Sequence, residues 1–250
     1  MLSDREIIST LDMVRSEHLD VRTVTLGVSL FDCVSHDLDL FIGNMRAKLR
    51  KYASNLVSVC NEVGDKYGIP VVNKRISVSP IAVVGGPFGP DGMVRICQAL
   101  DEAAQEAGVD FLGGFSALVE KGFAHGDKAL IEAIPEALAT TERVCSSINI
   151  ASSRAGINMD AAALMGRQIL ETARATADRG GFGCTKLVVF CNIPQDVPFM
   201  AGAYLGVGEP DCVINVGVSG PGVVKKAIDR ALEKSRSQGC GLSLLKVSEV

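Results

Sequence analysis

The sequence predicts an α/β protein, and two observations carry this prediction. Apolar runs of strand length alternate with segments of helical spacing along most of the chain. Some of these runs, such as Leu187–Cys191, are apolar at every position, which is typical of parallel strands covered by helices on both faces. Functional side chains of such proteins gather at the carboxyl ends of the strands, so we expect a site there.

The amino-terminal half begins with a capping box at Ser3–Glu6, and apolar residues at helical spacing then predict a first helix. Val21–Leu30 is rich in Val, Thr and Leu and predicts a strand. A long amphipathic helix is expected from about Asp37 to Gly68, where Gly68-Ile69-Pro70 ends it. A second strand is expected at Val71–Val78.

The alternation continues to about residue 236. A loop rich in glycine and proline at 85–92 precedes a helix that carries Met93, Ile96 and Leu100. Further strands are expected at 110–115, 144–150, 187–191 and 212–218. Further helices are expected at 127–138, where Pro135 breaks or bends the helix, at 158–178 and at 222–236. We therefore expect one α/β domain over residues 1–236, followed by a tail at 237–250 that fits the pattern poorly.

Composition limits the partners and the compartment. The 250 residues carry a net charge of −4 without a block of like charge, which disfavours nucleic acid and anionic membranes as partners. Eight scattered cysteines, without a CxxC pair or a Cys/His cluster, indicate reduced thiols and predict no metal site. No leader or membrane-spanning stretch is recognised, and no nucleotide-binding fingerprint assigns a cofactor. We expect a soluble, cytoplasmic protein.

The strongest candidate for a binding site is the turn Ser219-Gly220-Pro221-Gly222, which joins a strand to a helix-patterned segment. Free backbone N–H groups at a helix start attract anions, so Ser219, Gly220 and Gly222 are candidate ligand-binding residues. An equally weighted alternative is that these glycines only let the helix pack close to the sheet. Four side chains near strand ends join the candidate set for a carboxylate or phosphate: Lys74, Arg75, Asn149 and Arg154. Strand alternation places Lys74 and Arg75 on opposite faces.

Catalysis has two weaker candidates. Cys145 flanks a strand end, and a helix that starts nearby would lower the pKa of its thiol and make it a candidate nucleophile. Asp32 follows a strand and is a candidate acid or base. A buried, inert thiol is the favoured alternative for Cys145.

Six motifs together resemble a known family. They are Asn73–Pro80, Val109–Val119, Val144–Ser147, Ala155–Met159, Pro198–Ala203 and Ile214–Val224. In this order and spacing the chain is similar to the domain-of-unknown-function seven-eleven family, also called uncharacterised protein family two-ten. The resemblance covers the chain to about Glu233.

The resemblance implies a parallel-stranded half-barrel with outer helices, one half of a barrel like that of pyruvate formate-lyase. It also implies a homodimer without established activity, in a family whose members are longer than this chain. Three functions are left open. They are binding of a small anionic metabolite at the carboxyl ends of parallel strands, a lyase- or transferase-type enzyme acting on a carboxylate substrate, and a truncated, non-catalytic dimer scaffold.

Overall fold

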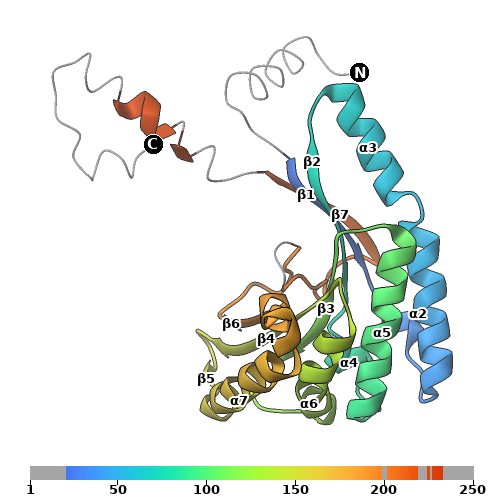
Figure 1. Cartoon of the computed structure of the whole chain (residues 1–250), viewed down its shortest axis with the longest axis vertical. Coiled ribbons are helices and arrows are strands. Elements are labelled where there is room, and N and C mark those ends of the chain that lie inside the picture. Colours follow the sequence, from blue (N-terminus) through green and yellow to red (C-terminus); the bar gives the residue numbers. More distant parts are fainter. Residues whose placement is uncertain (1–20, 199–201, 219–223, 226, 233–250) are drawn as a thin grey trace.

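An open, mostly parallel sheet forms the centre of the protein, and helices flank it (Figure 1). The computed structural model describes residues 21–198, 202–218, 224–225 and 227–232. In this part of the chain the strands run β5-β4-β3-β2-β1-β7, and β6 also pairs with β4. Their bounds are β1 (Val21–Val28), β2 (Val71–Val78), β3 (Phe111–Leu118), β4 (Val144–Ser152), β5 (Gly156–Ile157), β6 (Leu187–Cys191) and β7 (Cys212–Val218). The α/β prediction is confirmed, and the open sheet is consistent with a half-barrel.

The helices begin and end at residues with clear local roles. Asp37 caps α2 by accepting a hydrogen bond from the N–H of Leu40, and Asn158 caps α7 in the same way. Gly68 ends α3 in the left-handed conformation. The bounds are α2 (Leu38–Ala53), α3 (Leu56–Tyr67), α4 (Ile81–Val84), α5 (Pro90–Ala107), α6 (His125–Thr140) and α7 (Met159–Ala175), with 3-10 turns η1 (Phe31–Cys33), η2 (Ala177–Arg179) and η3 (Phe182–Lys186).

One helix prediction needs correction. The single helix expected from Asp37 to Gly68 is two helices, because Asn55 takes a non-helical backbone conformation between α2 and α3. Asparagine is a poor helix former, and the apolar periodicity that continues across this position hid the break. Pro135 lies inside α6 without ending it.

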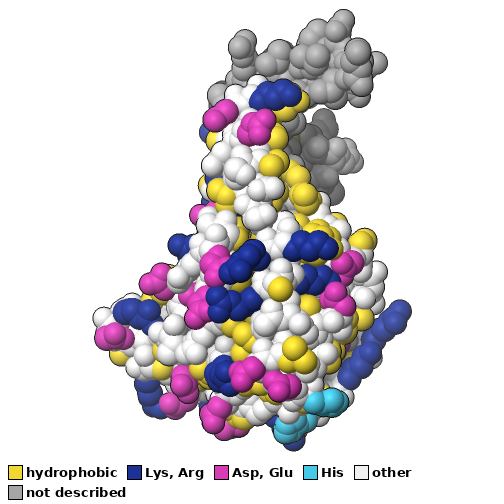
Figure 2. Space-filling view, turned by 90° about the vertical axis from the view of Figure 1, so that its right-hand side faces the viewer, with side chains coloured by type: hydrophobic (Ala, Val, Ile, Leu, Met, Phe, Trp, Pro, Cys, Tyr) yellow, Lys and Arg dark blue, Asp and Glu magenta, His cyan; other side chains and the backbone are white. Residues whose placement is uncertain are grey.

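The two faces of the sheet differ in chemistry. The helices pack on one face, here called the helix face, against a core that includes Val24, Leu26 and Ile76. The alternating residues of the same strands form the inner face, which carries Thr25 and Ser77. Figure 2 looks onto α2, α3 and α5, where acidic and basic side chains lie beside one another. Arg46 of α2, for example, pairs with Glu102 and Glu106 of α5. No described helix is long and apolar enough to cross a membrane.

Two described strands depart from the parallel direction of the sheet: the short β5 runs antiparallel to β4, and β7 runs antiparallel to β1. The chain reaches β7 from β6 through residues 192–211, and the N–H of Ser29 bonds to the carbonyl of Asp211 beside the carboxyl end of β1. Cys212 therefore pairs with Val28, and Val218 pairs with Val21 at the start of β1. The end of β7 consequently lies at the amino ends of the parallel strands.

Candidate functional site

A row of paired residues crosses the inner face over four neighbouring strands. Thr25 of β1 pairs with Arg75 of β2 on one side and with Asn215 of β7 on the other, and Arg75 pairs with Phe111 of β3. Directly paired residues point to the same face of a sheet. The register therefore gathers a guanidinium, a hydroxyl, an amide and an aromatic ring in one row, here called the Arg75 row (Asn215, Thr25, Arg75 and Phe111).

The Arg75 row contains buried polar atoms without hydrogen-bond partners among the described residues. These atoms are Nε of Arg75, Oγ1 of Thr25 and Nδ2 of Asn215, and the neighbouring hydroxyls of Thr23 and Ser77 share this property. The side chain of Thr25 is 0% exposed. Buried polar groups are normally paired, and leaving one unpaired costs about 1–3 kcal/mol. Several such atoms on one face therefore have hydrogen-bonding capacity that the described residues do not use.

Arg75 carries positive charge into this row, and no carboxylate of the described residues lies at bonding distance. Its guanidinium lies 5.3 Å from the centre of the Phe111 ring, a cation–π contact. Burial lowers the pKa of Arg75, and the nearby Cys145 and Asp110 act in the opposite direction. Arginine remains charged under all physiological conditions, so this cation and its unpaired Nε–H persist. An anion is the partner that satisfies both.

A short segment, Gly202–Gly206, lies across the inner face on the carboxyl side of the Arg75 row, and we call it the inner strap. The N–H of Leu205 bonds to the carbonyl of Val78 at 3.0 Å, and Oγ of Ser147 donates to the carbonyl of Gly202 at 3.1 Å. The strap comes so close to β3 that a Cβ on Gly113 would lie 2.2 Å from the carbonyl oxygen of Ala203. Only glycine fits there.

The structure separates the side chains that the sequence grouped into one site. Arg75 lies on the inner face, whereas Lys74 pairs with Val24 and so lies on the helix face, as strand alternation predicted. Asn149 lies near the carboxyl end of β4, where its Nδ2 donates to Glu120 at 3.2 Å and its buried Oδ1 has no partner among the described residues. Arg154 is exposed in the loop after β4. Of these four candidate side chains, only Arg75 lies in the row with Thr25, Asn215 and Phe111.

The glycine turn, Ser219, Gly220 and Gly222, lies outside the described residues. The last described residue before the turn is Val218, which pairs with Val21 at the start of β1. Asn149 and Arg154 lie at or beyond the carboxyl end of β4. The glycine turn as a ligand-binding element stays a prediction.

The two catalytic candidates lie in different surroundings. Asp32 belongs to a surface ion-pair group, in which Nζ of Lys48 contacts Asp32 at 2.7 Å and Asp211 at 2.6 Å. The hydrogen bond from Lys48 lowers the pKa of Asp32, which keeps this carboxylate ionised. Cys145 lies buried on the inner face, and burial raises the pKa of its thiol to about 11. A protonated, buried thiol lacks the activation that a nucleophile needs.

Sequence reasoning missed the residues that accompany Arg75. Thr23 and Thr25 alternate with Val24 and Leu26 in β1, and this alternation was a signal that β1 has one polar face. Asn215 gave a similar signal in β7. What the sequence lacked was the pairing register that sets these residues beside Arg75. Within the described ranges, no three His, Cys, Asp or Glu side chains gather as metal ligands.

Known proteins resemble this chain over nearly its whole length. The model of the family described as "Uncharacterised ACR (DUF711)" matches residues 12–246. A "UPF0210 protein" of Desulfovibrio desulfuricans is 81% identical over 251 residues, which cover 100% of this chain and 54% of the relative. A protein of the same description from Methanosarcina mazei is 58% identical, over 91% of this chain and 50% of the relative. The chain thus spans about half the length of the curated relatives it matches.

Proposed function

For this chain, which belongs to the DUF711 (UPF0210) family, we propose that the inner face of the sheet binds a small anionic metabolite at the Arg75 row. The observation that carries the proposal is the Nε–H of Arg75, which is buried and has no acceptor among the described residues. The anion is a carboxylate or a phosphate, because the planar guanidinium offers paired donors that match either group.

The neighbours of Arg75 suit such a ligand. The hydroxyl of Thr25 and the amide Nδ2 of Asn215 supply two neutral donors on the side away from Phe111. The Phe111 ring contacts the guanidinium through a cation–π interaction. This arrangement moves the expected site from the carboxyl ends of the strands to the middle of the inner face, beside the inner strap. The glycine turn lies outside the described residues, and the proposal does not rest on it.

Binding without catalysis fits these residues better than a lyase- or transferase-type reaction. A covalent or acid–base mechanism needs an activated group beside the bound anion. Cys145 is a thiol near Arg75, but burial raises its pKa to about 11, so the thiol stays protonated at neutral pH. Asp32 is held by Lys48 in its surface group. The dimer scaffold needs no ligand, so an anion titration separates it from the binding function.

The test is thermal unfolding of the chain in increasing concentrations of inorganic phosphate, with succinate as a dicarboxylate probe and chloride at matched ionic strength. A ligand that binds only the folded state stabilises it by about 2.7 kcal/mol at a hundred times its Kd. We expect phosphate or succinate to raise the unfolding temperature of the natural chain, and Arg75→Met to abolish this increase. Arg75→Lys keeps the charge but not the paired donors, so we expect a partial response.

Lys74→Met is the matched control, because it removes a cation from the adjacent position on the opposite face of β2. It should leave the anion response unchanged. A response that survives Arg75→Met, or that Lys74→Met abolishes equally, refutes the proposed site. No response of the natural chain to either probe above the chloride baseline refutes binding of these anion classes.

A further inference from the structure

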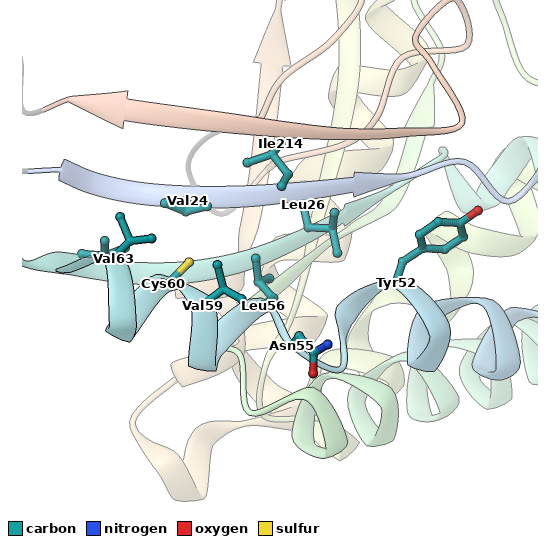
Figure 3. A pocket seen from close by; sticks show the side chains of 10 residues that line it. Val24, Leu26, Tyr52, Asn55, Leu56, Val59, Cys60, Val63 and Ile214 are labelled. Carbon is teal, nitrogen blue, oxygen red and sulfur yellow. The ribbon is translucent and has the colours of Figure 1, made fainter. Parts of the chain in front are cut away.

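The helix face has an apolar groove beside α3 and the edge strand β7, and no other described element covers it. Figure 3 shows Leu56, Val59, Cys60 and Val63 of α3 pointing toward Val24 and Leu26 of β1 and Ile214 of β7. The groove has a volume of about 320 Å³. Figure 2 shows hydrophobic side chains along α3 as well. Apolar surface that gathers in this way marks a place where another element packs.

The most exposed apolar side chains of this region belong to β7. Ile214 and Val216 are 61% and 57% exposed, although they pair with Leu26 and Val24, which belong to the buried core. β1, β3 and β4 contact helices on this face, whereas β7 packs extensively only against β1 within the described residues. Among the described elements, no helix therefore covers the last strand of the sheet.

The chain itself continues from β7 into a segment that fits this position. Residues 224–225 and 227–232 are helical. Val224, Ile228 and Leu232 follow one another at a spacing of four residues, so they form one stripe of the helix, and all three are exposed. Lys225 and Asp229 lie beside the stripe and give the helix a polar side. An amphipathic helix of this kind is stabilised by packing its apolar stripe.

The lengths of the two elements match. Val224 and Leu232 lie about 12 Å apart along a helix that rises about 1.5 Å per residue. Ile214 and Val218 lie about 13 Å apart along a strand that rises about 3.3 Å per residue. A helix that turns back after β7 therefore spans the groove from the end of β7 to Ile214. The inner face of β7 offers no comparable apolar surface, because it carries Asn215 and Gly217.

We propose that the helical residues 224–225 and 227–232 dock on the helix face, antiparallel to β7, with Val224, Ile228 and Leu232 in the groove between α3 and β7. Other strands of this sheet are also followed in the chain by a helix that packs on the helix face. α2 follows β1 in this way, and α6 follows β3. Docking there covers Ile214 and Val216 and closes the helix face at the edge of the sheet. The proposal does not depend on anion binding.

The test uses tryptophan fluorescence, because the natural chain contains no Trp. Ile228→Trp places a single indole in the apolar stripe, and Asp229→Trp places it about 100° around the same helix as the matched control. We expect blue-shifted emission for Ile228→Trp and emission typical of water for Asp229→Trp. Adding Val63→Lys, which puts a charge into the groove, should shift the emission of Ile228→Trp to the red and leave that of Asp229→Trp unchanged.

The proposal is overturned if the single variant Ile228→Trp emits as in water, or if adding Val63→Lys does not change the emission of Ile228→Trp. A blue shift that appears only with rising protein concentration, together with a doubled mass in light scattering, also overturns it, in favour of a second copy in the groove. Hydrogen exchange on the natural chain is an independent check, because it needs no substitution. Amides of 227–232 should exchange more slowly than those of an isolated peptide of the same sequence, and equal rates contradict docking.

Discussion

Gly113→Ala tests whether the inner strap holds its position over the sheet. The added Cβ would lie 2.2 Å from the carbonyl oxygen of Ala203 and 2.9 Å from its Cβ, so either the strap or β3 must shift by about 1 Å to restore van der Waals contact. Overpacking of this kind costs about 1–3 kcal/mol. The shift also strains the hydrogen bonds of Leu205 and Gly202, each of which contributes about 1 kcal/mol.

We therefore expect Gly113→Ala to lower the free energy of unfolding by about 2–4 kcal/mol. The assay is urea unfolding followed by circular dichroism. Gly166→Ala is the matched control, because a Cβ at this position of α7 meets no atom within 4 Å. Removing glycine from a helix interior should stabilise that variant by about 0.5–1 kcal/mol. If Gly113→Ala unfolds at the same urea concentration as the natural chain, the strap does not press on β3 and this reasoning is refuted.

Two further predictions follow from buried polar groups. Asp101→Ala should destabilise the fold by about 3 kcal/mol in the same urea assay, because Oδ1 of Asp101 accepts from the N–H groups of Glu142, Arg143 and Val144. Glu102→Ala, on the exposed side of the same helix, should cost less than about 1 kcal/mol, and equal losses would contradict the assigned role. Since thiolate is the reactive form and burial raises the pKa of Cys145 to about 11, iodoacetamide should label Cys145 far more slowly than exposed Cys191 at pH 7, and labelling should accelerate until about pH 11. Peptide mass spectrometry measures both rates, and equal rates at pH 7 would refute the protected thiol.

Sequence reasoning predicted the local features of this fold well. The predicted bounds of β2 (Val71–Val78) and β6 (Leu187–Cys191) are confirmed. Their apolar and β-branched residues favour a strand whatever the rest of the chain does. The family membership inferred from six motifs is confirmed. The alternation that sets Lys74 and Arg75 on opposite faces also needs no tertiary information.

The candidate site was predicted only in part. Arg75 was identified as a candidate cation, and its partners Thr25 and Asn215 were not, because they lie 50 or more positions away along the chain. The composition of a segment and the spacing of its apolar residues describe residues that are close in sequence. The site is made of residues that are neighbours across the sheet. The break at Asn55 shows the same limit on a smaller scale, since the apolar period continues through it.

By itself the sequence determined the type of each main element, the family, and which residues of a strand share a face, because periods of two and 3.6 residues are local properties of the backbone. Only the tertiary structure decided that β7 runs antiparallel, that Asn215, Thr25 and Arg75 stand in one row, and that Gly113 lies beneath the inner strap. Strand direction and register arise from hydrogen bonds between distant segments, and these are chosen by how the whole chain packs.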